Sequence, residues 1–262
     1  KRILNALIKA KKKGVIVQII LEYSPYKAKG ENKKTLRALK KNKIKVYKGN
    51  KRFAFTHEKS MVIDHRISLI MTGNFTYSAF THQRNFIFIT TNKKVAAEIE
   101  QQFLSDMHSI VFQPKLKALT WSPNNSRTHI MEFIASANTE LDFYEQGIDD
   151  GEISALIAET GKKHNMDIKL LVSTNAPKQN CNTLHFLANK HVSIRIMATP
   201  YLHAKVILKD HETALISSIN LTTNSLDNNR ELGITTEDHA VLAKLNKQFD
   251  VDWRNAEKFI HC

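Results

Sequence analysis

An internal duplication constrains this chain more than any other feature of its sequence. A set of polar residues in the first half recurs in the second half at a constant offset of 146 residues, with no gap between its first and last members. The matched pairs are His57 and His203, Lys59 and Lys205, Asp64 and Asp210, Thr72 and Ser218, and Asn74 and Asn220. A fixed offset means that two similar structural units follow each other along the chain. We therefore divide the chain into a first repeat, residues 1–112, and a second repeat, residues 113–262.

Apolar, β-branched segments alternate with helical patterns in the same order in both repeats. The first repeat has expected strands at 15–21, 44–47, 60–64, 67–71 and 86–90, and expected helices at 1–13, 31–42 and 93–107. The second has expected strands at 140–144, 167–173, 192–197, 204–209, 213–217 and 232–235, and expected helices at 126–137, 152–164, 182–190 and 238–256. This alternation predicts an α/β fold of two pseudo-symmetric repeats, each a mixed, mostly parallel sheet flanked by helices, with one active site between them.

The second repeat starts earlier in its pattern than the first. The helix at 126–137 and the strand at 140–144 precede the helix at 152–164, whereas the chain opens inside the equivalent of that last helix. We therefore expect a strand and a helix, roughly 25–30 residues, to precede Lys1 in a longer protein. Without that strand, its neighbour in the sheet would have an unpaired edge.

Positive charge is concentrated at the start of the chain. Residues 1–52 hold 18 Lys and Arg against Glu22 and Glu31, which gives this segment a charge of +16. The whole chain has a net charge of +14, so the remaining residues together carry −2. Such asymmetry indicates a polyanionic partner, which could be a nucleic acid or an anionic membrane surface. The alternative is a lysine-rich composition that only decorates the solvent-facing sides of helices. The sequence does not give the oligomeric state.

No apolar run approaches the 18 residues of a membrane-spanning helix. We expect a soluble or peripheral protein, in a bacterial cytoplasm or secreted. No histidine pair stands with a third ligand at zinc spacing, so we expect no metal and no other cofactor.

Each His-x-Lys unit predicts chemistry on phosphorus. Side chains two residues apart point to the same face of an extended segment, so each histidine lies beside its lysine. If the repeats pack about a pseudo-twofold axis, two imidazoles and two ammonium groups surround one phosphodiester. One imidazole can attack phosphorus and form a covalent phosphohistidine, while the other protonates the leaving alkoxide. Lysines and the amides of Asn74 and Asn220 can stabilise the charge on the phosphoryl oxygens.

The two histidines must begin in different protonation states, so their neighbours matter. Glu231 lies 28 residues after His203, and Asn85 lies at the equivalent distance from His57. We expect Glu231 to accept a bond from His203 and favour its imidazolium form, and Asn85 to accompany His57. This makes His57 the expected nucleophile and His203 the expected acid.

The two copies of His-x-Lys-x4-Asp, each followed by a Thr/Ser-x-Asn turn, resemble the motifs of the phospholipase D superfamily. Residues 201–234 are especially similar to bacterial phospholipase D and cardiolipin synthase-type members. The resemblance implies a two-lobed α/β fold, one active site between the lobes, no metal, and a phosphohistidine intermediate resolved by water or an alcohol. Met71 and Ser217 stand where the family often has Gly, and Asn85 stands where an acidic residue is expected.

The resemblance also assigns roles by position. His57 and His203 match the catalytic histidines, Asp64 and Asp210 the motif acids, and Lys59, Lys205, Asn74 and Asn220 the phosphate-binding set. We add Asp64 and Asp210 to the catalytic residues, although an odd separation from each lysine places them on the opposite strand face. Thr72 and Ser218 are assigned to substrate binding, with a purely local role in the turn as the alternative.

Three functions are compatible with these residues. The first is a phospholipase D that hydrolyses the head group of a glycerophospholipid or transfers it to an alcohol. The second is a metal-independent nuclease, which the basic N-terminal segment favours because lysine-rich faces bind phosphate backbones. The third is a non-catalytic anion-binding protein.

Overall fold

The structure, a computed structural model, describes residues 1–23, 25, 30 and 32–260. Its helices are α1 (Arg2–Lys12), α2 (Lys33–Lys41), α3 (Tyr77–Thr81), α4 (Lys93–His108), α5 (Ser126–Ala135), α6 (Gly151–Thr160), α7 (Ala176–Gln179), α8 (Cys181–Ala188), α9 (Thr223–Asp227) and α10 (His239–Asn255). Its strands are β1 (Gln18–Leu21), β2 (Lys45–Lys48), β3 (Ser60–Ile63), β4 (Ile67–Met71), β5 (Gln83–Arg84), β6 (Ile87–Thr90), β7 (Leu119–Ser122), β8 (Glu140–Glu145), β9 (Asp167–Ser173), β10 (Ser193–Met197), β11 (Tyr201–Leu202), β12 (Lys205–Lys209), β13 (Thr213–Ser217), β14 (Glu231–Thr236) and β15 (Glu257–Lys258).

The second repeat is built on one large mixed sheet, in the order β15-β10-β9-β8-β12-β13-β14-β7. The expected mixed α/β class is confirmed. The expected parallel majority is wrong for this sheet, because within the described residues only β8–β9 and β9–β10 pair in parallel. The reason is visible in the chain: residues 210–212 join β12 to β13, and so short a connection closes a hairpin rather than a crossover.

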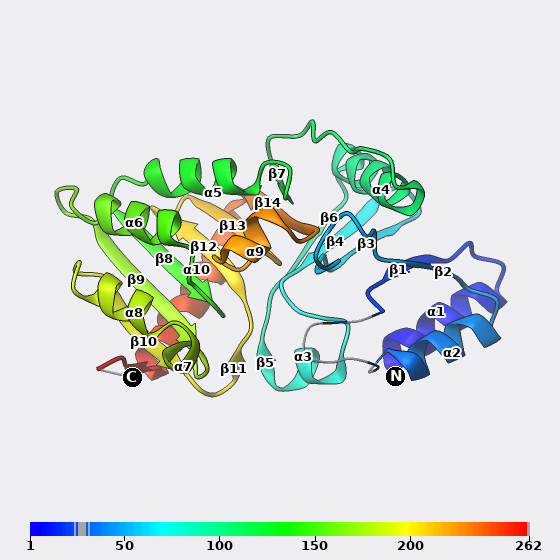
Figure 1. Ribbon diagram of the computed structural model, residues 1–262, viewed down its shortest axis with the longest axis horizontal. Helices are drawn as coiled ribbons and strands as arrows, with labels where there is room; N and C mark the ends of the chain where they lie inside the picture. The colour runs from blue at the N-terminus through cyan, green and yellow to red at the C-terminus, as the bar shows by residue number, and fades with distance from the viewer. Residues whose placement is uncertain (24, 26–29, 31, 261–262) are drawn as a thin grey trace.

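Helices cover both faces of this sheet (Figure 1). Successive side chains of a strand point to opposite faces, so Phe143 packs in the core under α5, α6 and α8, while Tyr144 packs in the core against α10. The core between the sheet and α10 continues into the first repeat, where it includes Ile70 of β4 and Ile99 of α4. Both repeats therefore contribute side chains to this core.

The first repeat has two separate sheets. β1 and β2 form a parallel pair beside α1 and α2, and β3, β4 and β6 form an antiparallel sheet. In the second repeat, β8 lies between β9 and β12 and so links the parallel strands β9 and β10 to the antiparallel strands β12 and β13 in one sheet. The described residues of the first repeat place no strand at that position, which is why its sheet is divided. No helix within the described ranges has both the length and the apolar character needed to cross a bilayer.

Candidate active site

The two repeats exchange backbone segments immediately before each histidine of the His-x-Lys units. Upstream of His203, β11 pairs in parallel with β5 of the first repeat, and the His203 N–H donates to the Arg84 carbonyl at 3.2 Å. Upstream of His57, Thr56 forms the equivalent bridge to Arg230, and the His57 N–H donates to the Arg230 carbonyl at 2.9 Å. These symmetric crossings bring the histidine of one repeat to the polar strand residues of the other.

The side-chain partners of the histidines are exchanged in the same way. The His57 Nδ1–H donates to Glu231 Oε2 at 2.8 Å, and the His203 Nδ1 lies 3.1 Å from Asn85 Oδ1. Our expectation that Glu231 would hold His203 and that Asn85 would accompany His57 is therefore wrong. A histidine partner does lie 28 residues after each histidine, but the backbone crossing presents it to the histidine of the opposite repeat.

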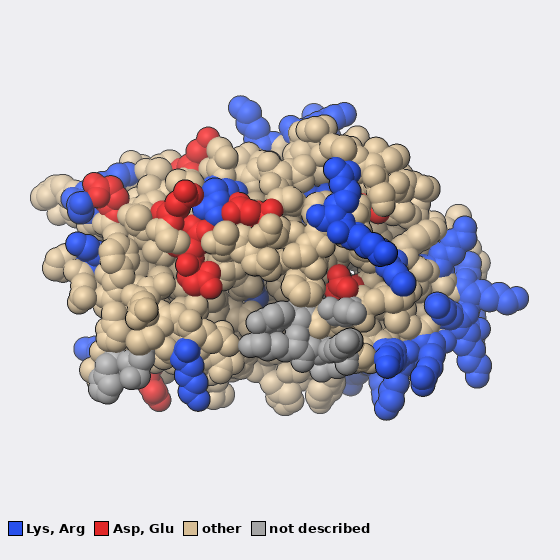
Figure 2. Space-filling view, in the orientation of Figure 1, with Lys and Arg blue, Asp and Glu red and all other residues tan. Residues whose placement is uncertain are grey.

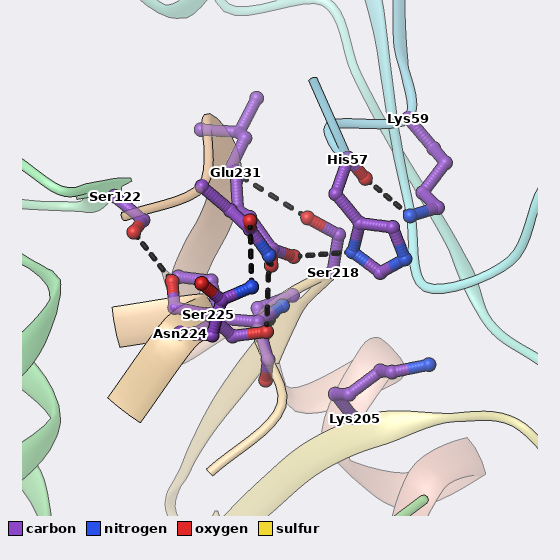
Figure 3. Close-up of polar contacts among 12 residues, drawn as sticks. His57, Lys59, Ser122, Lys205, Ser218, Asn224, Ser225 and Glu231 are labelled. Carbon is purple, nitrogen blue, oxygen red and sulfur yellow. Dashed lines mark hydrogen bonds and ion pairs between the residues drawn. The ribbon is translucent and has the colours of Figure 1, made fainter. Parts of the chain in front are cut away.

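Glu231 is completely buried and fully engaged (Figure 3). Its Oε1 accepts from Asn229 Nδ2 at 2.9 Å while Oε2 holds His57. Burial raises the pKa of Glu231, but the His57 charge and hydrogen bond, Lys59 and Asn229 outweigh burial and leave that pKa below its ordinary value. Glu231 is thus an ionised carboxylate, which fixes the His57 proton on Nδ1 and leaves the Nε2 lone pair free.

Asn85 is oriented by its own contacts. Its Nδ2 donates to the Ala79 carbonyl at 3.1 Å, and its Oδ1 accepts from Thr72 Oγ1 at 3.1 Å. The amide oxygen is therefore the atom that faces His203, so it accepts the Nδ1–H and leaves Nε2 free at this ring too. Gly73 makes room for Asn85, because a Cβ on Gly73 would lie 2.4 Å from the Asn85 Cγ.

Both lysines are buried beside their histidines. Lys205 donates to the His203 carbonyl and to Gln146 Oε1, each at 2.7 Å, and Lys59 donates to the His57 carbonyl. Burial lowers the pKa of Lys205 to about 8 and lowers the pKa of Lys59 well below its ordinary value. Glu231 counteracts burial at both lysines, and Glu145 does so at Lys205.

The imidazoles lie in one electrostatic environment. Burial lowers the pKa of His203 strongly, and the charges of Lys205, Lys59 and His57 lower it further. Burial also lowers the pKa of His57, but Glu231 opposes this shift. Residues of both repeats thus influence the charge of each ring, and His57 is the ring better able to carry positive charge.

Asp64 and Asp210 lie away from this site, which corrects their assignment as catalytic residues. Each follows the strand that runs from its motif lysine, β3 or β12, so about 16 Å of extended chain separates it from that lysine. Asp210 caps a backbone turn: its carboxylate accepts from the N–H groups of residues 138–140 at 2.8–3.1 Å. Asp64 is exposed at the equivalent turn. Both have left-handed backbone conformations, with φ of 53° and 52°.

Thr72 and Ser218, assigned to substrate binding from the sequence, have backbone partners beneath the histidines. Both are fully buried; Thr72 Oγ1 accepts from the Phe86 N–H at 2.9 Å, and Ser218 Oγ accepts from the Leu232 N–H at 3.3 Å. They tie neighbouring strands together beneath the histidines, and Thr72 also orients Asn85. Asn74 is exposed at the start of its turn, and the Oδ1 of Asn220 is buried without a described partner. These two amides remain candidates for substrate binding.

Two groups of residues escaped the sequence reasoning. Glu145 and Gln146 end β8 beside Lys205, and Glu145 is 1% exposed with one carboxylate oxygen unpaired. The first repeat has no described counterpart of β8, so no repeat signal marked them.

The second missed group is a pair of ion pairs exchanged between the repeats. Arg84 binds Asp252 at 2.7 Å, and Arg230 binds Asp106 at 2.8 Å. Asp106 and Asp252 also differ by 146 residues, so extending the repeat beyond the strands would have found them. One pair holds α10 of the second repeat to Arg84 of the first, and the other holds α4 of the first repeat to Arg230 of the second.

The site offers nitrogen nucleophiles and cations rather than a metal cage. Within the described residues, no three His, Cys, Asp or Glu side chains lie close enough together to hold a metal ion. Two imidazoles with free Nε2 atoms and two buried ammonium groups are instead suited to a tetrahedral anion. This arrangement supports covalent catalysis at phosphorus with charge stabilisation by lysine.

Comparison with solved structures finds the same fold. Phosphatidylserine synthase from Haemophilus influenzae Rd KW20 aligns with a TM-score of 0.72 at 12% identity, over 99% of this chain and 79% of that one. Polyphosphate kinase from Porphyromonas gingivalis aligns with a TM-score of 0.72 at 16% identity, over 97% of this chain, which spans 41% of that one. Nuc, a phospholipase D family member from Salmonella typhimurium, aligns with a TM-score of 0.51 at 18% identity, over 54% of this chain and 95% of that one. At these identities the likeness concerns the fold alone.

A family model decides the affiliation. No curated protein sequence matches the chain. The model of the phospholipase D-like domain of cardiolipin synthase matches residues 1–107 and 130–253, which include both His-x-Lys units and their exchanged partners. This chain therefore belongs to the cardiolipin synthase-type phospholipase D-like family, within the phospholipase D superfamily of phosphodiester-acting enzymes.

Proposed function

We propose that this protein is a metal-independent phosphodiesterase that hydrolyses the head group of glycerophospholipids through a phosphohistidine on His57. The observation that supports it best is the exchanged pair of contacts, His57 with Glu231 and His203 with Asn85. These contacts hold two imidazoles from different repeats with their Nε2 atoms free. The lysines beside them supply the charge that a phosphodiester monoanion requires.

His57 is the nucleophile in this mechanism, for a reason that differs from the one drawn from the sequence. Attack by Nε2 on phosphorus leaves the imidazole ring with a positive charge, and the Glu231 carboxylate, 2.8 Å from Nδ1, stabilises that charge. The neighbours of the His203 Nδ1 are the neutral amide oxygen of Asn85 and the Lys205 Nζ, 3.3 Å away, neither of which is negatively charged, so His203 holds a proton weakly. A weakly held proton is readily given to a leaving alkoxide, so His203 is the acid.

The first step forms a P–N bond to His57 and breaks the P–O bond to the head group. His203 gives its proton to the departing oxygen, which leaves as the free alcohol. The negative charge of the bound phosphodiester raises the pKa of His203 and so provides for its protonation on binding. In the second step His203 takes a proton from water as the water oxygen attacks phosphorus, the P–N bond breaks, and phosphatidic acid leaves. An alcohol in place of water would give transphosphatidylation.

The nuclease is the second candidate, and the basic end of the molecule favours it. The same chemistry would cleave a polynucleotide, and lysine-rich surfaces bind phosphate backbones without sequence preference. An anionic membrane surface would attract the same charges. Chain charge alone therefore does not separate the two substrates.

One experiment separates the candidates. The protein is incubated in EDTA with phosphatidylglycerol vesicles labelled in the head group, and separately with plasmid DNA. The proposal predicts glycerol release without nicking, and nicking without glycerol release would overturn it in favour of the nuclease. Failure of both reactions, together with no turnover of a soluble aryl phosphodiester, would leave the non-catalytic function.

The covalent step has its own test. Brief reaction, quenching in alkali and mass analysis of peptides should find the phosphatidyl group on the peptide that contains His57. His57→Asn should abolish the adduct and lower turnover by at least about a thousandfold. His65→Asn is the matched control, because the His65 side chain is 88% exposed in the turn after β3. An adduct on His203 would invert the assignment.

A further inference from the structure

The far end of the first repeat combines lysines with bare aliphatic side chains. Figure 2 shows Lys and Arg gathered at the end of the molecule that α1 and α2 form in Figure 1. The last turns of the two helices carry Lys9, Lys11 and Lys12, and Lys40 and Lys41. Lys13, Lys43 and Lys45 follow directly. None of these eight lysines forms an ion pair with a described residue.

The two connections that leave these helices lie side by side. β1 and β2 are parallel neighbours, with Gln18 opposite Lys45, so the segments that enter them share one end of the sheet. Both helices end in the same way: the Val15 N–H bonds to the Ala10 carbonyl at 3.2 Å, and the Ile44 N–H bonds to the Leu39 carbonyl at 3.1 Å. In this ending the residue that donates the long bond normally packs back on its helix.

The connection after α1 departs from that rule. Ile44 is 3% exposed and packs as expected, whereas Val15 at the equivalent position is 46% exposed. Ile16 after it is 84% exposed, the highest value among the large hydrophobic side chains described. A Cβ on the preceding Gly14 would meet nothing within 4 Å, so the segment stands clear of the rest of the molecule.

The second repeat lacks this feature at the corresponding place. Its connection from α6 to β9 reads Gly161-Lys-Lys-His-Asn-Met166, with no exposed aliphatic side chain. At this connection the described residues of the first repeat expose Val15 and Ile16, whereas those of the second repeat expose only polar and charged side chains.

We propose that this basic–aliphatic tip, Val15 and Ile16 with the eight lysines around them, docks the protein onto an anionic lipid bilayer. The lysines draw the tip to acidic head groups, and the two aliphatic side chains enter the interface. A polynucleotide could also bind the lysines, but an exposed isoleucine would contribute nothing to binding its phosphate backbone. The inference rests on the proposed function for the identity of the substrate, a membrane phospholipid. It adds which part of the protein contacts the membrane that contains this substrate.

The tip recruits and does not catalyse. It lies at the outer end of β1 and β2, and none of its residues contacts the histidines or their partners. Changes in the tip should therefore alter membrane binding and turnover of vesicle substrate, while hydrolysis of a soluble aryl phosphodiester stays unchanged. This separation makes the proposal testable apart from the chemistry.

The test is co-sedimentation of the full chain with vesicles of phosphatidylcholine alone and of phosphatidylcholine with phosphatidylglycerol. Binding should need phosphatidylglycerol and should weaken as salt screens the lysines. Ile16→Ser should lower the partition coefficient about tenfold. Lys13→Glu with Lys41→Glu should lower it at least about thirtyfold.

Matched controls keep the result specific. Ile89→Ser removes an isoleucine that is 62% exposed on β6, outside the tip, and Lys190→Glu changes an exposed lysine in the second repeat. Both should bind vesicles as the wild type does. Thermal melts identify any variant that has lost its fold.

Several outcomes would overturn the proposal. Wild-type protein that ignores phosphatidylglycerol, or Ile16→Ser protein that binds as well as wild type, would do so. Equal losses in the Ile89→Ser control would also contradict it. Tight binding of duplex DNA that Ile16→Ser leaves intact, without vesicle binding, would assign the lysines to a polynucleotide. Loss of dimers in Ile16→Ser, without vesicle binding, would assign the tip to a second copy. Absence of diester hydrolysis with intact vesicle binding would instead count against the proposed function alone.

Discussion

The exchange of Asn85 for aspartate is the most informative perturbation of the site. It keeps the size of a side chain whose Oδ1 lies 3.1 Å from His203 Nδ1 and adds one negative charge. Aspartate fits where glutamate does not, because Gly73 lies directly against the Asn85 side chain.

The magnitude follows from Coulomb's law. Unit charges about 4 Å apart interact by about 4 kcal/mol at an effective dielectric constant near 20, which corresponds to about three pKa units. The new carboxylate is partly desolvated and loses the bond that Nδ2 gives the Ala79 carbonyl, so its net effect is smaller. We expect the pKa of His203 to rise by at least about one unit. The sign is fixed, since an adjacent anion always favours imidazolium.

The assay is the rate of adduct formation with a soluble aryl phosphodiester across pH, together with NMR titration of the labelled imidazoles. A general acid with a higher pKa stays protonated to higher pH, so the alkaline limb should move upward by at least about one unit. Glu231→Gln is the matched control, because it removes a charge from His57 and should move the acid limb downward. An unchanged alkaline limb in folded Asn85→Asp, with the His203 pKa raised by NMR, would refute the role of His203 as the acid.

Three further predictions follow from the same geometry. Burial raises the pKa of Glu145 well above its ordinary value, while the neighbouring Lys205, whose own pKa burial lowers to about 8, favours the Glu145 carboxylate. If that carboxylate supports the Lys205 ammonium, Glu145→Gln should make KM for an anionic diester rise more steeply between about pH 7 and 9 than in wild type, with kcat little changed; an unaltered KM profile would show that Glu145 is neutral there. The lowered pKa of His203 means that the unfolded chain binds more protons below about pH 6.5, so His203 lowers stability as pH drops through that value by up to about 1.4 kcal/mol per unit. Denaturant unfolding of His203→Asn should show a shallower slope, since His57, whose pKa is also lowered, keeps its own contribution; an equal slope would contradict the prediction. Asp210→Ala should lower the free energy of unfolding by about 2–3 kcal/mol, because it removes several hydrogen bonds to a turn, and should leave kcat unchanged. Asp64→Ala should change neither quantity. A large loss of kcat in Asp210→Ala would restore the catalytic assignment of Asp210.

The repeat signal identified the candidate reacting groups because their chemistry constrains their spacing. His-x-Lys on an extended segment must place both side chains on one face, and an offset of 146 residues must superimpose the two copies if the units are similar. The structure places Asp64 and Asp210 in the turns that follow β3 and β12, although the resemblance drew them into the catalytic set. Local periodicity also located most strands, such as Asp167–Ser173 and Thr213–Ser217.

Partner exchange could not be read from the chain in this way. Sequence distance suggested that Glu231 serves His203, because both belong to one repeat and to nearby strands. The structure assigns Glu231 to His57 because short backbone crossings, such as that of Thr56 with Arg230, place each histidine against the other repeat. Such long-range pairing leaves no local periodicity.

The antiparallel pairing of β12 and β13, in contrast, could have been predicted from the sequence, because the length of their connection indicates it. Only residues 210–212 separate two expected strands, and a connection of that length excludes a parallel crossover. Strand–helix alternation elsewhere in the repeat favours parallel pairing, which the described strands of the large sheet have only between β8, β9 and β10. The residues of β8, Glu145 among them, carry no repeat signal and become visible only when the register places Glu145 opposite Lys205.

The central claim is that both imidazoles act on a single phosphorus atom. Orthovanadate, a mimic of the five-coordinate phosphorus, tests it most directly when bound to the protein and examined by titration and crystallography. We predict one vanadate per chain, with the Nε2 atoms of His57 and His203 on opposite sides of it and binding lost in either His→Asn variant. Two independent vanadates, or one that contacts a single ring and survives replacement of the other, would contradict the claim.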